Sequence, residues 1–129
     1  MATAESKLEL ANQHLEGVHA AWEELDWVDL SLYGFYALEA AVEAATLHKQ
    51  MNVQKAHWAR ADAAKVLHSQ YGLPDVSELL RDLNEARKSV AYGDVDAPDL
   101  DAEDVASDIE SFIDAVEKLM QSGNEDTGD

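Results

Sequence analysis

The segment 30–51 constrains the fold more than any other part of the chain, because it is apolar on nearly every side until Thr46. It reads LSLYGFYALEAAVEAATLHKQM, and Glu39 and Glu43 are the only acidic residues in it. Its composition predicts a helix, and a helix that is apolar all round lies at the centre of a bundle or against a second subunit. The periodicity of the segment favours neither of these two positions.

A second helical pattern precedes this segment. Apolar residues recur at steps of three and four from Leu8 to Leu25, which is typical of a helix with one face in a bundle seam. Ser6 and Glu9 have the spacing of a capping box at its start. Asp29 is the predicted cap of the helix that follows.

Three more helices are expected after residue 51, each with an apolar stripe and each bounded by turn residues. No alternating strand pattern, internal repeat or glycine-rich phosphate loop interrupts them. Their expected limits are about 52 to 71 (ended by Gly72 and Pro74), Asp75 or Ser77 to Gly93, and a cap at Asp101 to Met120.

The sequence therefore predicts an all-α fold, an up-and-down bundle of about five helices. The 21 alanines among 129 residues agree with this, since alanine is the strongest helix former. Residues 1–121 are expected to form one domain. The polar, acidic segment 122–129 is expected to be a disordered tail.

The charge of the chain limits its partners. There are 27 acidic residues and 9 basic ones, a net charge of −18, so duplex nucleic acid and anionic membranes are poor partners. The segment 47–91 contains seven bases and five acids, whereas 94–129 contains one base and 13 acids. An anion-binding surface is therefore expected in the middle of the chain. The absence of cysteine, of a long apolar run and of a signal-peptide pattern predicts a cytoplasmic protein without thiolate sites.

Metal and cofactor sites are not expected. Glu16 and His19, with Glu23 one turn further on, give one Glu-x-x-His pair, but a di-iron bundle needs a second such pair and the chain has none. His57 and His68 are spaced to share one helix face beside two basic residues. Polar histidines at the edge of an alanine-rich stripe explain this row better than an anion site does.

Two stretches, with a histidine-containing helix between them, carry a family resemblance. They are Tyr33–Ala44 (YGFYALEAAVEA) and Ala86–Asp94 (ARKSVAYGD). Together they resemble the HEPN domain, named for higher eukaryotes and prokaryotes nucleotide-binding, over roughly residues 8–120. The resemblance implies a helical bundle that commonly forms a homodimer. Many members are RNases, often toxins paired with a small nucleotidyltransferase antitoxin, and others have lost activity.

The resemblance also implies a site, in which this chain departs from the family. Active members carry an Arg that is followed, after four to six residues, by a His, and two copies face each other across the dimer cleft. Arg87 matches the Arg, but Tyr92, Gly93 and Asp94 occupy the positions for the His, and no His follows His68. A phenol with a pKa of about 10 is a poor substitute for an imidazole that titrates near neutral pH.

Candidate binding residues are therefore Arg87, Lys88, Tyr92 and Glu39, where Glu39 matches a polar position on an earlier helix that often supports the family's site. Arg87 and Tyr92 are catalytic candidates only if the protein is an RNase. Three functions stay open: a non-catalytic interaction or accessory module, a HEPN-type RNase toxin, and an unrelated ligand- or metal-binding bundle. The first implies a homodimer and a nucleotidyltransferase-like partner. Nucleic-acid binding is expected only for single-stranded RNA or a nucleotide at Arg87.

Overall fold

Five helices account for almost all of the chain that the computed structural model describes, which is residues 3–24, 27–52, 57–91 and 102–126. No strand occurs within these ranges, so the predicted all-α bundle is confirmed. The helices are α1 (Ala4–Glu23), α2 (Trp27–His48), α3 (His57–Tyr71), α4 (Ser77–Ala91) and α5 (Ala102–Asp126).

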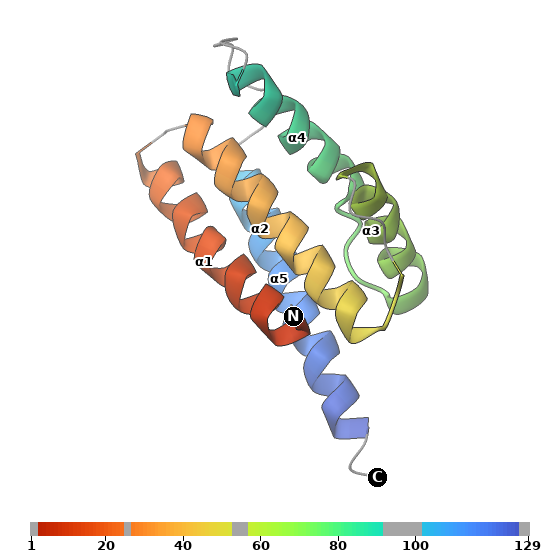
Figure 1. The fold of residues 1–129 in the computed structure, drawn as a ribbon. Helices are drawn as coiled ribbons and strands as arrows, with labels where there is room; N and C mark the ends of the chain where they lie inside the picture. The colour runs from red at the N-terminus through yellow and green to blue at the C-terminus, as the bar shows by residue number, and fades with distance from the viewer. Residues whose placement is uncertain (1–2, 25–26, 53–56, 92–101, 127–129) are drawn as a thin grey trace.

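Helix α2 lies at the centre of the bundle. It packs against each of the other four helices, with α1 and α4 on either side of it and α5 behind (Figure 1). α1 and α4 both run antiparallel to α2. The side chains of α2 explain this position, because its five alanines and also Leu30, Leu38 and Val42 are buried on several faces.

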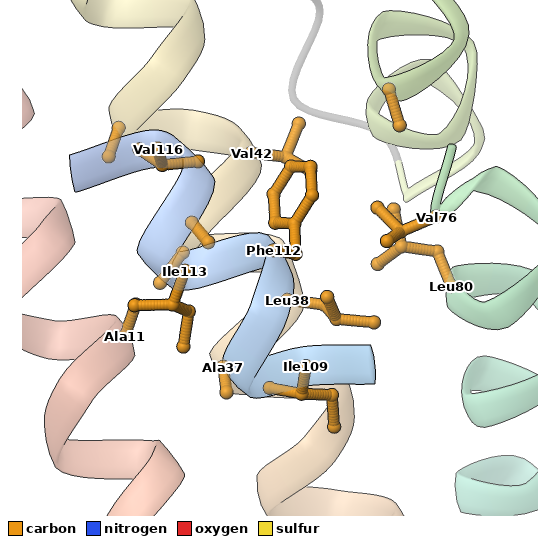
Figure 2. Packing of buried hydrophobic residues seen from close by; sticks show 14 of the residues in the cluster. Ala11, Ala37, Leu38, Val42, Val76, Leu80, Ile109, Phe112, Ile113 and Val116 are labelled. Carbon is orange, nitrogen blue, oxygen red and sulfur yellow. The ribbon is translucent and has the colours of Figure 1, made fainter. Parts of the chain in front are cut away.

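The core lies where α5 crosses behind α2 and meets the start of α4. Phe112 of α5 is fully buried, and Figure 2 shows its ring beside α2 and facing the α4 side. Large side chains from three segments fill this region, each at most 3% exposed: Leu38 and Val42 of α2, Val76 and Leu80 at the start of α4, and Ile109, Ile113 and Val116 of α5.

The start of α1 differs from the prediction by one turn. Thr3 is the N-cap: its Oγ1 accepts a hydrogen bond from Ser6 N at 3.0 Å, and Ser6 Oγ accepts one from Thr3 N at 2.9 Å. The predicted capping box of Ser6 and Glu9 was therefore wrong. The pair Thr3 and Ser6, three residues earlier, forms the box, because a serine hydroxyl can accept the hydrogen bond from the N-cap N–H as a glutamate carboxylate does.

The turn between α3 and α4 follows the sequence signals. Gly72 has a φ of +74°, the left-handed conformation expected of a glycine that ends a helix, and its N donates to His68 O at 3.1 Å. α4 begins at Ser77, the later of the two predicted positions. Asp75 Oδ1 accepts hydrogen bonds from both Ser77 N at 3.0 Å and Ser77 Oγ at 2.7 Å, and these bonds lower the pKa of the Asp75 carboxyl.

Other boundaries shift modestly. α2 begins at Trp27, so Asp29 lies in its first turn instead of at the cap. The negative charge of Asp29 there still interacts favourably with the helix dipole. α3 begins at His57, whereas the sequence predicted a start at about residue 52. Asn52 is not helical, and residues 53–56 lie outside the described residues. α5 continues to Asp126, past the boundary predicted at 121. None of the described helices is both long and apolar enough to cross a membrane.

Candidate functional site

Arg87 of α4 packs against the central helix. Its guanidinium carbon lies 5.0 Å from the centre of the Phe35 ring of α2, within the range of a cation–π contact. One turn earlier on α4, Asn84 Oδ1 accepts a hydrogen bond from Arg87 Nη2 at 2.8 Å. The ring and the amide together orient the guanidinium of Arg87, which as a residue is partly exposed.

The charge of Arg87 has no carboxylate partner within the described part of the chain. Its hydrogen-bond acceptor there is a neutral amide, and its Nε is buried without any hydrogen-bond partner. Other cations in this acidic protein do have acidic partners: Lys7 with Glu43 at 2.7 Å, Arg60 with Glu43 at 2.7 Å, Arg81 with Asp62 at 3.5 Å and Lys88 with Glu85 at 3.9 Å. Arg87 therefore keeps its capacity to bind an external anion.

The other predicted site residues are placed differently. Lys88 is exposed, and it follows Arg87 directly, so it points to a different side of α4. Glu39 lies one turn after Phe35 on α2, and its Oε2 is 3.7 Å from Arg60 Nη1 of α3. Tyr92 lies outside the described residues, so its position relative to Arg87 stays a prediction.

A charged cluster across three helices was missed by sequence reasoning. Glu43 of α2 accepts hydrogen bonds from Arg60 Nε of α3 at 2.7 Å and pairs through its other oxygen with Lys7 of α1. These side chains are only 15–27% exposed. The signal was present, because acids in an otherwise apolar helix need cationic partners when buried. The cluster holds α1 and α3 to opposite edges of α2.

The histidines contribute to structure where they are described. His68 Nδ1 lies 2.8 Å from Leu73 O and bridges the turn after α3. His19 Nε2 lies 3.7 Å from Glu110 Oε2 of α5, and both side chains are about half exposed. Across the described ranges, no three His, Asp or Glu side chains are grouped so that they could hold a metal ion. The side chain of His57 is not among those described.

An aromatic contact between α1 and α2 was also missed. The ring of His14 lies 6.2 Å from the ring of Tyr33 and 5.5 Å from that of Tyr36, and burial lowers the pKa of His14. Gly17 makes the contact possible, since a Cβ there would lie 2.7 Å from Tyr33 Cγ. Gly17 within α1 was the available signal, because glycine is favoured where another segment approaches the backbone closely.

The sequence was compared with families of known proteins. The family model described as HEPN domain matches residues 1–119, which covers α1 to α4 and most of α5. The chain belongs to the HEPN family. A search of curated proteins finds no match to it. Within this HEPN domain, the resemblance equates Arg87 with the family's arginine, and α4 presents that arginine to the central helix α2.

Proposed function

We propose that this HEPN domain is a non-catalytic interaction module that acts in the cytoplasm as a homodimer, with a nucleotidyltransferase-like protein as its partner, as in the family's toxin–antitoxin pairs. The observation that carries the proposal is that no His follows Arg87 at any position. Removal of a proton from an RNA 2′-hydroxyl is best done by a group that titrates near neutral pH. A tyrosine, whose unperturbed phenol has a pKa of about 10, is a poor base for that step.

The charge of the protein supports the same conclusion. A net charge of −18 opposes the approach of a polynucleotide, whose affinity for proteins comes mostly from phosphate contacts with cations. Lys7, Arg60, Arg81 and Lys88 are already paired with carboxylates. An RNase toxin that uses Arg87 and Tyr92 is therefore the less favoured alternative.

A second role is favoured by the state of Arg87. Arg87 is partly exposed as a residue, and its guanidinium is oriented by Asn84 and Phe35 and has no acidic partner among the described residues. An oriented guanidinium without an acidic partner presents a planar set of N–H donors that binds one oxyanion well. We therefore assign Arg87 an anion-binding role, which needs no proton transfer and survives the loss of the histidine.

Exposed aromatic and aliphatic side chains on α1 and α2 support the homodimer. Self-association would bury them, since large apolar side chains left exposed on a folded domain are candidates for an interface. These side chains are between 36% and 42% exposed: Trp22 on α1, and Tyr33, Tyr36 and Leu47 on α2.

A charge placed on this surface is expected to separate the dimer. Tyr36→Glu should convert dimers into monomers with an unchanged helical spectrum, because the carboxylate would be desolvated in the interface. Tyr71→Glu is the matched control, since Tyr71 of α3 has the same exposed fraction of 36% on another helix. It should stay dimeric. Sedimentation equilibrium measures both variants, and a monomeric wild type or a dimeric Tyr36→Glu variant would contradict the proposed interface.

A further inference from the structure

We propose that His14 makes the homodimer dependent on pH: the surface formed by α1 and α2 associates while the His14 imidazole is neutral and separates when that imidazole takes up a proton. The inference rests on the homodimer proposed above and on the surface assigned to it. It adds a means of regulation to that surface, and it assigns the regulation to one residue.

His14 contacts two of the aromatic side chains assigned to the dimer surface. The centre of its ring lies 5.5 Å from that of Tyr36 and 6.2 Å from that of Tyr33. Both tyrosines are 36% exposed, and His14 is partly exposed. α1 and α2 lie side by side and run in opposite directions, so these three residues form one aromatic cluster across their contact (Figure 1). A second copy that covers the two tyrosines therefore covers His14 as well.

Burial of the His14 ring disfavours its charged form. In the single chain the ring is already partly buried, and this burial lowers the pKa of His14 below 6.5. A second copy would remove the water that still reaches the ring, and the loss of that water lowers the pKa of a histidine further. Because the dimer then holds a proton on His14 less tightly than the monomer does, protonation of His14 favours the monomer.

The carboxylates that follow the two tyrosines on α2 already have cationic partners. Glu39 Oε2 lies 3.7 Å from Arg60 Nη1. Glu43, one turn further on, pairs with Arg60 and with Lys7 of α1, each at 2.7 Å. These acids are engaged by cations, so α2 presents to His14 the two phenols, which are neutral near pH 6.

Helix α5 also packs on α1, but it faces another histidine. Glu110 of α5 lies 3.7 Å from His19, which is five residues after His14 and therefore about 140° further round α1. The residues one turn from His14 on α1 do not titrate: Leu10, Ala11, Gly17 and Val18. Burial is therefore what lowers the proton affinity of His14.

Acidification acts on the dimer in two opposite directions. It reduces the net charge of −18 on each copy, and weaker repulsion strengthens association. This effect is spread over the exposed surface and is screened by salt. Protonation of His14 weakens association, and a symmetric interface contains two copies of His14. At physiological ionic strength the effect of His14 should dominate as the pH falls below the ordinary histidine pKa of about 6.5.

Sedimentation equilibrium of the full chain at about pH 7.5 and about pH 5.5, at constant ionic strength, tests the proposal. The dissociation constant of the wild-type dimer should rise at least about tenfold at the lower pH, because both copies of His14 must stay neutral in the dimer. His14→Gln has a neutral side chain at both pH values, so its dissociation constant should stay constant or fall. His19→Gln is the matched control. The His19 side chain is 44% exposed on a different side of α1, so this variant should respond to pH as the wild type does.

An NMR titration of the His14 imidazole in the wild type measures the same coupling without a variant. The pKa of His14 should be lower in a concentrated sample, which is dimeric, than in a dilute sample, which is monomeric. The same pKa in the monomer and in the dimer would overturn the proposal.

The failure of this inference can be distinguished from the failure of its premise. If the wild type is monomeric at about pH 7.5, the proposed homodimer itself is wrong. If the wild-type dimer has the same dissociation constant at both pH values, or if His14→Gln weakens on acidification as much as the wild type does, only the further inference fails. Loss of the helical circular dichroism spectrum together with dissociation would indicate unfolding and would also overturn it.

Discussion

Loss of the folded state is the expected result of replacing Ala41 by glutamate. Ala41 lies in the middle of α2 and is fully buried. A glutamate there must either bury a carboxylate without a partner or force apart the helices that pack on α2. Either cost is comparable with the total stability of a domain, about 5–15 kcal/mol. The variant should show no cooperative thermal transition by circular dichroism at 222 nm.

Ala20→Glu provides the control for this experiment. Ala20 lies on α1 and is exposed, so the same substitution should change stability by no more than about 0.5 kcal/mol. A cooperative transition near the wild-type temperature in Ala41→Glu would contradict the central position of α2.

Phe112→Ala is expected to destabilise the protein by about 3–5 kcal/mol. The ring is fully buried and lies among Leu38 and Val42 of α2 and Val76 and Leu80 on the α4 side (Figure 2). Its removal takes away the contact that joins three helices and leaves a cavity that rigid helices cannot close.

Urea unfolding measures this loss, and Phe112→Leu serves as the matched variant. Leucine fills much of the same volume, so it should lose less than half as much stability as alanine does. A loss below about 1 kcal/mol in Phe112→Ala would show that α5 is not held in the core as described.

The helices were predictable because their signals are local. An apolar pattern on all sides placed α2 in a bundle, although only packing could distinguish its centre from a subunit interface. Gly72 ended α3 as expected, since no other residue adopts its φ of +74° so readily. The cap of α1 was missed because Thr3 with Ser6 and Ser6 with Glu9 both have the spacing of a capping box.

The candidate site was less predictable, because it depends on packing between distant segments. Arg87 came from the family resemblance, but Phe35 gained its role only through the approach of α4 to α2. The burial of Glu43 required a cationic partner, but no local sequence pattern indicates which of the nine basic residues it is, and the structure shows that Arg60 is one partner.

RNA cleavage is the most direct measurement of whether the domain is catalytic. The purified wild type and Arg87→Ala are incubated with single-stranded RNA without added metal, after circular dichroism has established that both are folded. A non-catalytic module with Tyr92 at the position of the histidine predicts no cleavage by either protein. Cleavage by the wild type that is lost in a folded Arg87→Ala variant would contradict it and would establish an RNase built on Arg87.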